Sequence, residues 1–165
     1  MNYILIGMPA SGKSTVGVVL AKQYGMDFAD TDLIIQQNEK MLLQEIIDKH
    51  GINALLEAEE RALLSVNGDN MVIATGGSAV YSELGMAKLK SLGKIIYLQL
   101  PYRLMLSRLN NIRTRGVVLK NGETLAHMYE ERVPLYEKYA DITVNCAVRR
   151  KILTVEEIIQ KICFS

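Results

Sequence analysis

Short apolar runs alternate with amphipathic segments along the whole chain. The apolar runs are rich in Ile, Val, Leu and Tyr, and most end at Gly, Pro or Asp. Runs of this length with such boundaries favour buried β-strands. The pattern therefore predicts strands at 3–7, 26–30, 71–77, 94–100 and 141–145.

The segments between these runs place apolar residues at helical spacing. Gly25 and Gly51 stand where a helix would end, and Pro134 interrupts a helical pattern. The predicted helices cover 13–25, 42–51, 53–68, 82–93, 102–111, 124–140 and 154–165. Strands that alternate with helices imply right-handed crossovers and a mainly parallel sheet with helices on both faces. We therefore expect a three-layer α/β/α fold with a five-stranded sheet, built as one domain over residues 1–165.

The first strand leads into a glycine-rich motif. Gly7, Gly12, Lys13 and Ser14 satisfy the pattern G-x-x-x-x-G-K-[ST], which here follows a strand and opens a helix. Small residues let backbone N–H groups surround a phosphate, and the helix N-terminus adds partial positive charge. In such a loop the lysine reaches the β- and γ-phosphates and the hydroxyl binds Mg²⁺. A plain turn would explain the glycines alone, so the full pattern predicts a nucleotide-binding phosphate loop.

Composition excludes several classes of partner and location. The 165 residues include 19 basic and 18 acidic side chains, a net charge of +1 that gives no reason to expect nucleic acid or an anionic membrane. Cys146 and Cys163 form no C-x-x-C pair and indicate free thiols in a reducing cytoplasm. His50 and His127 lack metal-ligand spacing, and the chain starts without a signal-peptide pattern or a membrane span.

A second pair of polar residues follows the strand at 26–30. Asp30 and Asp32 are two positions apart, and the carboxyl ends of strands are where open α/β sheets hold ligands. One carboxylate can bind Mg²⁺, and the other can orient or deprotonate an acceptor hydroxyl. The alternative is that Asp30 or Thr31 only caps the next helix. Because the chain lacks the N-K-x-D guanine motif, a small-molecule kinase suits these parts better than a GTPase.

Three further features suit a kinase, each with a simpler alternative. Gly76 and Gly77 either form a plain turn or bring backbone N–H groups close to a ligand. The segment 112–123 lacks periodicity and carries Arg113 and Arg115, so it is either a lid over the phosphates or a solvated basic loop. Arg132 is either an exposed helix residue or an anion ligand.

The order of motifs GMPASGKST, DTD, TGGSAV, RGVVL and ERVPLY resembles the shikimate kinase family over nearly the whole chain. This family consists of small P-loop kinases of the nucleoside-monophosphate-kinase type. The resemblance implies a cytoplasmic monomer that uses ATP with Mg²⁺ to make shikimate 3-phosphate and ADP. It also implies a lid at about 110–124 and an acceptor-binding helical region at about 31–62.

Carried over residue by residue, the resemblance implies three groups of site residues. The nucleotide-binding residues are Ala10, Ser11, Gly12, Lys13, Ser14, Thr15, Arg108, Arg115 and Arg149. The acceptor-binding residues are Asp32, Gly76, Gly77 and Arg132, while Ser14 and Asp30 hold the metal. Within these groups, Lys13, Asp32 and Arg115 are implied to be catalytic.

The chain departs from the family pattern at the acceptor site. In the stretch GINALLEAE, Leu56 stands where the family has one of two arginines that bind the acceptor carboxylate, although Glu59 is retained. Ser78 replaces the third glycine of the family's glycine turn. Arg61 is five residues beyond Leu56, about 140° round the helix, and is a poor replacement. The chain is therefore a shikimate kinase with a weakened carboxylate site, a related kinase for another polyol or sugar acid, or a nucleotide-binding module without turnover.

Overall fold

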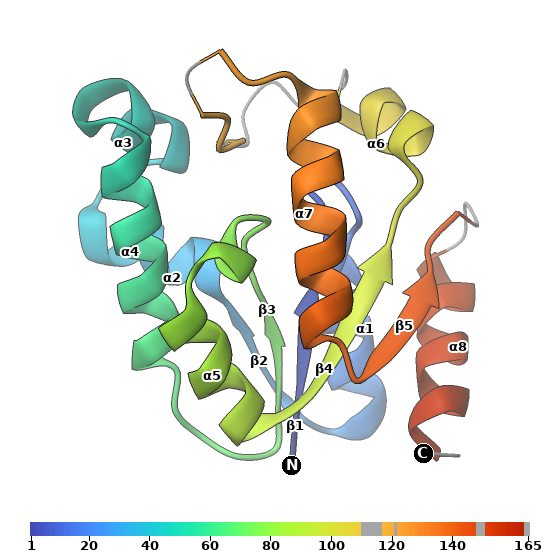
Figure 1. The fold of residues 1–165 in the computed structure, drawn as a ribbon. Helices are drawn as coiled ribbons and strands as arrows, with labels where there is room; N and C mark the ends of the chain where they lie inside the picture. The colour runs from blue at the N-terminus through green and yellow to red at the C-terminus, as the bar shows by residue number, and fades with distance from the viewer. Residues whose placement is uncertain (110–116, 121, 148–150, 164–165) are drawn as a thin grey trace.

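A computed structural model describes residues 1–109, 117–120, 122–147 and 151–163, without the side chains of 151–153 and 163. All five strands are parallel, in the spatial order β2-β3-β1-β4-β5 (Figure 1). They are β1 (Asn2–Ile6), β2 (Asp27–Asp30), β3 (Met71–Ala74), β4 (Gly93–Gln99) and β5 (Ile142–Asn145). The predicted fold class is confirmed, and every predicted strand is present.

Helices cover both faces of the sheet. On one face, α1 (Lys13–Tyr24) packs against β1, β2 and β3 and against α8 (Lys151–Cys163). On the other face, α5 (Glu83–Leu92) and α7 (Leu125–Tyr139) pack against β4 (Figure 1). Every residue of β1 is buried, because this central strand has a neighbour on each edge and a helix layer on each face. The sheet thus brings the carboxyl ends of β1, β2 and β3 to one edge.

Three helices stand beside the sheet and form a small core of their own. They are α2 (Thr31–Glu39), α3 (Leu43–His50) and α4 (Ile52–Ser65). Their buried side chains cluster with Val118, which lies within the predicted lid: Ile35, Ile46, Leu55, Ala58, Ala62 and Val118. The sequence predicted α3 and α4 but gave 31–39 only as part of a helical region. The apolar core therefore links the predicted acceptor region to the base of the lid.

Helix ends follow the local signals with one difference. Gly25 ends α1 in the left-handed conformation, and Gly51 lies between α3 and α4. Helix α7 runs through the exposed Pro134, as the predicted helix over 124–140 does, whereas α8 begins three residues before the predicted start. The short elements α6 (Tyr102–Leu109) and η1 (Ala79–Tyr81) complete the described chain. Among the described residues, no helix has the length and apolarity needed to cross a bilayer.

Candidate active site

The glycine-rich loop joins β1 to α1 and has the shape that a phosphate requires. Gly12 adopts the left-handed region at φ 97° just before the helix, and Ala10 is also left-handed at φ 64°. Lys13 is buried, and its Nζ donates to the carbonyls of Gly7 at 2.7 Å and Met8 at 2.9 Å. The ammonium group therefore lies across the loop, where it can exchange carbonyl contacts for phosphate oxygens.

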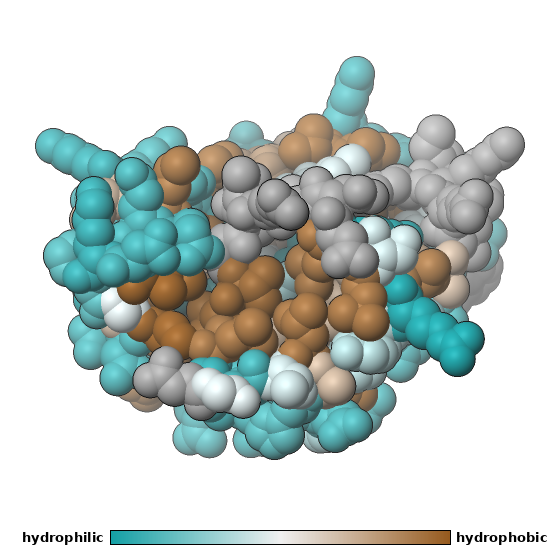
Figure 2. Space-filling model, turned by 90° about the horizontal axis from the view of Figure 1, so that it is seen from above, coloured by the Kyte–Doolittle hydropathy of each residue, from teal (hydrophilic) through white to brown (hydrophobic). Residues whose placement is uncertain are grey.

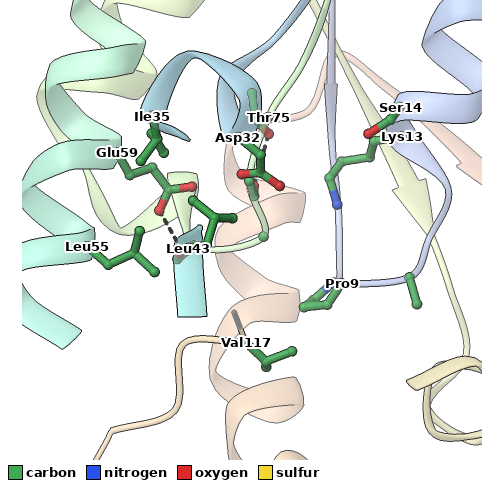
Figure 3. A pocket seen from close by; sticks show the side chains of 14 residues that line it. Pro9, Lys13, Ser14, Asp32, Ile35, Leu43, Leu55, Glu59, Thr75 and Val117 are labelled. Carbon is green, nitrogen blue, oxygen red and sulfur yellow. Dashed lines mark hydrogen bonds between the residues drawn. The ribbon is translucent and has the colours of Figure 1, made fainter. Parts of the chain in front are cut away.

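A pocket opens between this loop and helices α2, α3 and α4 (Figure 3). Its polar side chains come from α1, α2, α4 and the turn after β3: Lys13, Ser14, Asp32, Glu59, Thr75 and Ser78. Its apolar side chains come from the loop, the three helices and the lid base: Pro9, Ile35, Leu43, Leu55 and Val117. Seen from the carboxyl edge of the sheet, apolar surface fills the middle of the face, with hydrophilic side chains around it (Figure 2). One pocket thus combines a phosphate loop with carboxyl groups and an apolar wall.

The two aspartates after β2 have different positions. The Asp30 carboxylate caps α2 by accepting from the Asp32 N–H at 3.0 Å, while the Asp32 side chain lines the pocket. Between them, the buried Thr31 hydroxyl accepts from the Gly76 N–H at 3.1 Å. The start of α2 is thereby tied to the glycine turn. Capping by Asp30 is observed, and its predicted role at Mg²⁺ stays a prediction.

The glycine turn has no room for a side chain at its first position. A Cβ atom at Gly76 would lie 2.0 Å from Oε1 of Glu59 and 2.9 Å from Oδ1 of Asp32. The two carboxyl groups therefore converge on one point above the turn. The Gly77 carbonyl accepts from the Tyr136 hydroxyl at 2.5 Å, while the Gly77 N–H makes no hydrogen bond to any described residue. The predicted contact of this N–H with a ligand stays a prediction.

Glu59 is a site residue to which the sequence analysis assigned no role. It is 3% exposed, and its Oε2 accepts a hydrogen bond from the Ser78 hydroxyl at 2.5 Å (Figure 3). Burial raises the pKa of Glu59 to about 7; the Ser78 hydrogen bond opposes this rise, and the nearby charge of Asp32 adds to it. A signal was present in the sequence, because Glu59 falls on the apolar stripe of α4: Leu55, Ala58, Glu59, Ala62 and Leu63.

Arg132 lies behind the glycine turn rather than on the surface. The side chain is 1% exposed; its Nε donates to the Tyr81 hydroxyl at 3.1 Å and its Nη2 to the Val118 carbonyl at 2.6 Å. A Cβ atom on Gly77 would be 3.3 Å from Nη1 of Arg132, so the guanidinium borders the pocket. No carboxylate of the described chain pairs with it. A buried cation with only neutral partners is a site for a ligand anion.

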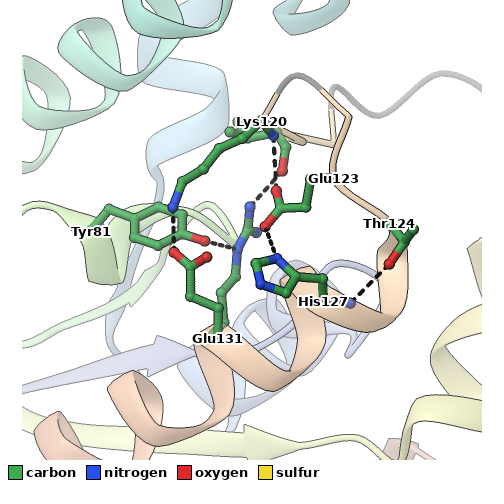
Figure 4. A network of polar contacts seen from close by, with 8 residues as sticks. Tyr81, Lys120, Glu123, Thr124, His127 and Glu131 are labelled. Carbon is green, nitrogen blue, oxygen red and sulfur yellow. Dashed lines mark hydrogen bonds and ion pairs between the residues drawn. The ribbon is translucent and has the colours of Figure 1, made fainter.

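Residues 120 and 123 of the predicted lid are held by polar contacts to Tyr81, His127 and Glu131 (Figure 4). Lys120 pairs with Glu131 at 2.5 Å and lies 5.0 Å from the centre of the Tyr81 ring. Glu123 accepts from the Lys120 N–H at 2.8 Å and contacts the ring nitrogen of His127 at 3.1 Å. These contacts anchor the chain directly after Val117, which lines the pocket, and Val118, which lies in the core of α2, α3 and α4.

A family model described as shikimate kinase matches residues 9–163. The chain belongs to the shikimate kinase family. Two relatives named shikimate kinase, from Sulfurihydrogenibium sp. and Clostridium botulinum, are 32% and 34% identical; the alignments cover 98% and 93% of this chain and 97% and 93% of the relatives.

Solved structures agree with this assignment. A structure described as shikimate kinase from Acinetobacter baumannii in complex with shikimate is 29% identical with a TM-score of 0.88, covering 98% of this chain and 92% of that one. Shikimate kinase from Aquifex aeolicus is also 29% identical, with a TM-score of 0.85 and coverage of 98% and 96%. The fold is therefore that of a P-loop kinase.

Of the remaining predicted site residues of this shikimate kinase family member, some are placed by the structure and others lie outside the residues that it describes. Arg108 lies beside the phosphate loop, where its guanidinium donates to the carbonyls of Ala10 at 3.2 Å and Cys146 at 3.3 Å. Thr15 is exposed at the start of α1. Three predicted arginines lie outside the described residues: Arg113, Arg115 and Arg149.

The departure at Leu56 has a clear structural setting. Leu55 lines the pocket beside the phosphate loop, whereas Leu56 lines a neighbouring cavity with Glu57, Glu60, Tyr81 and Ser82, which shares Glu59 and Ser78 with the pocket. Arg61 pairs with Glu39 at 2.9 Å on the surface. Arg132 is thus the arginine that the described structure brings to this pocket.

Proposed function

We propose that this chain is an ATP-dependent kinase that transfers the γ-phosphoryl group of MgATP to a hydroxyl of shikimate, giving shikimate 3-phosphate and ADP. The observation that carries the proposal is a single pocket in which Lys13 of the phosphate loop, the Asp32 carboxylate and the glycine turn in front of Arg132 all meet. A donor phosphate and an acceptor hydroxyl can lie next to each other there.

On the nucleotide side, the loop amides and Lys13 hold the phosphates. Ser14 and Asp30 offer the hydroxyl and carboxylate oxygens that Mg²⁺ prefers, and Ser14 lies in the pocket beside Lys13. When bound, Mg²⁺ neutralises charge on the phosphates. Arg108 is next to the loop, and the proposal keeps Thr15, Arg115 and Arg149 as nucleotide-side residues. Lys13 stabilises the charge that develops on the transferred group.

On the acceptor side, Asp32 accepts the hydrogen bond of the attacking hydroxyl and takes its proton as the new ester bond forms. Arg132 pairs with the acceptor carboxylate, and the N–H of Gly77 gives a backbone contact next to it. Gly76 keeps the space in front of Asp32 open. Nη2 of Arg132 donates to the Val118 carbonyl, and Nη1, next to Gly77, is the atom that faces the acceptor carboxylate.

The proposal includes the setting in which the enzyme works. A cytoplasmic monomer with one domain, a lid at about 110–124 and an acceptor region at 31–62 fits the buried Cys146, which forms no disulfide within the described chain, and the core that α2, α3 and α4 share with Val118.

The test is ADP formation from ATP and Mg²⁺ with shikimate, quinate or gluconate as the acceptor. We expect shikimate to stimulate ADP release most strongly, and the Lys13→Ala variant to lose this stimulation. Stronger stimulation by another acid would make the chain a related kinase with a different acceptor, as the loss of the arginine at Leu56 allows. ADP release that no acceptor stimulates would contradict the proposal.

A further inference from the structure

Two hydrogen bonds fix the direction of the Arg132 guanidinium. Nε donates to the Tyr81 hydroxyl at 3.1 Å, and Nη2 donates to the Val118 carbonyl at 2.6 Å. The third nitrogen, Nη1, lies 3.3 Å from the position of a Cβ atom on Gly77, at the edge of the pocket. Because the guanidinium group is planar and rigid, the two hydrogen bonds also determine where Nη1 points. The orientation of this arginine is therefore set before a ligand binds.

Tyr81 is the partner of Arg132 that contributes a side chain. It is the last residue of η1, and its N–H donates to the Ser78 carbonyl at 2.9 Å, so the tyrosine is tied to the glycine turn. The side chain is half-buried, and the guanidinium carbon of Arg132 lies 5.0 Å from the centre of its ring. Tyr81 lies outside the motifs TGGSAV and ERVPLY on which the family resemblance rests. Those motifs therefore did not predict its contact with Arg132.

The Tyr81 hydroxyl gives Arg132 a hydrogen-bond acceptor without a negative charge. Burial raises the pKa of this hydroxyl, so the group stays neutral near physiological pH. Lys120 lies 5.0 Å from the ring centre and pairs with Glu131 (Figure 4). The pKa of Glu131 is lowered mainly by the hydrogen bond from Lys120, and to a lesser extent by one from the Tyr81 hydroxyl. A neutral partner leaves the positive charge of Arg132 for an anionic ligand, whereas a carboxylate in its place would compete with that ligand.

The orientation of Arg132 matters more in this chain because of Leu56. Leu56 stands at the position of the second family arginine, and it lines the same cavity as Tyr81. Among the described residues, Arg132 is the arginine next to the pocket, so a carboxylate there depends on how well this one guanidinium is oriented. We propose that Tyr81 is a positioning residue, whose hydroxyl holds Arg132 with Nη1 toward the acceptor carboxylate and so offsets the absence of an arginine at Leu56. This inference rests on the proposed function, because it concerns binding of the same acceptor.

The Tyr81→Phe variant tests this role, because it removes the hydroxyl and keeps the ring. Nε of Arg132 then loses its acceptor, the guanidinium is less well oriented, and its pair with the acceptor carboxylate weakens. We expect the KM for shikimate to rise about tenfold, which is typical for the loss of one hydrogen bond to a charged group. The kcat should change by less than about twofold, since the carboxylate contact is as strong in the ground state as in the transition state. The KM for ATP should stay unchanged.

A matched control is available on β4. Tyr97 is a buried tyrosine that stacks on Tyr136 with the ring centres 5.0 Å apart, and its hydroxyl has no hydrogen-bond partner among the described residues. Tyr97→Phe therefore removes a tyrosine hydroxyl next to α7 without taking a partner from Arg132. Both KM values of Y97F should equal those of the wild type. Urea unfolding of Y81F and Y97F measures any loss of stability separately from the loss of acceptor binding.

A neutral analogue of the acceptor separates the orientation of Arg132 from a general effect on the pocket. The analogue is the primary amide of shikimate, which keeps the ring hydroxyls and lacks the negative charge. It cannot form a charged bidentate pair with Arg132, so the wild type should use it with a lower kcat/KM than shikimate. Y81F should use the amide about as well as the wild type does, because the interaction that Tyr81 supports is already lost. A purely structural role of Tyr81 would lower kcat/KM for both substrates.

The outcomes separate this inference from the proposed function. If the wild type phosphorylates shikimate but Y81F and Y97F have the same KM for it, or if Y81F loses as much with the amide as with shikimate, the role of Tyr81 is wrong and the kinase assignment stands. If the wild type phosphorylates no acceptor, the proposed function fails. Calorimetric titration of the wild type and Y81F with shikimate then decides on Tyr81 separately: about tenfold weaker binding by Y81F would support its role, and equal or absent binding would contradict it.

Discussion

Because the pKa of Glu59 is raised in the folded chain, we expect the folding stability to depend on pH. Glu59 is buried, and its pKa is raised from 4.5 to about 7 mainly by burial. Between these values the folded chain binds a proton that the unfolded chain has released, so stability is highest below pH 4.5 and falls as the pH rises through 7. This difference corresponds to about 3 kcal/mol of unfolding free energy, at 1.36 kcal/mol per tenfold change in proton affinity.

The assay is urea unfolding of the wild type and E59Q at pH values from 5 to 8.5, extrapolated to water. Subtracting the two free energies removes the contribution of every other titrating group. Stability of E59Q relative to the wild type should increase by about 2.5 kcal/mol across this range and level off above pH 7 to 8. A difference that stays constant, or one that falls with pH, would refute a protonated Glu59. E60Q is the matched control. Glu60 is the next residue of α4 and accepts a hydrogen bond from the Ser82 hydroxyl at 2.6 Å.

Three further predictions concern the same site. Gly76→Ala should lower acceptor turnover by at least tenfold and destabilise the fold by about 1–3 kcal/mol, because the new methyl group would displace the carboxyl groups of Glu59 and Asp32. A variant with the activity and the urea unfolding of the wild type would contradict the close approach of these two groups to Gly76. Arg132→Lys should raise the acceptor KM by about 10- to 100-fold and leave the KM for ATP unchanged, because lysine cannot form a bidentate pair with the acceptor carboxylate. Equal effects on both KM values would contradict a role of Arg132 in acceptor binding. Removing Mg²⁺ with a chelator should abolish turnover and added Mg²⁺ should restore it; turnover in the chelator would argue against Ser14 and Asp30 as metal ligands.

The sequence predicted the elements whose signals are local. Strands β1, β3 and β4 are short apolar runs with clear boundaries, and the phosphate loop combines two glycines, a lysine and a hydroxyl within eight residues. The sequence did not predict α2 as a separate helix, because its apolar residues, Leu33, Ile34 and Ile35, are consecutive rather than periodic.

The part of the site that the sequence did not predict depends on contacts between distant segments. Ser78 meets Glu59 only because the turn after β3 lies against α4, and the Arg132 guanidinium meets the Val118 carbonyl only through the packing of the lid base on α7. A departure such as Leu56 also could not be interpreted from the motif alone. In the structure Leu56 lines the cavity beside Glu59, whereas Leu55 lines the pocket next to the phosphate loop.

The most direct test of the central claim is to follow the phosphorus atoms themselves. Phosphorus NMR of the purified chain with ATP, Mg²⁺ and shikimate should show the γ-phosphate signal disappear while a phosphate monoester of shikimate and ADP appear in equal amounts. The Lys13→Ala variant should leave ATP intact over the same time. Release of inorganic phosphate without an ester, or ATP that remains unchanged with the wild type, would contradict phosphoryl transfer to an acceptor hydroxyl.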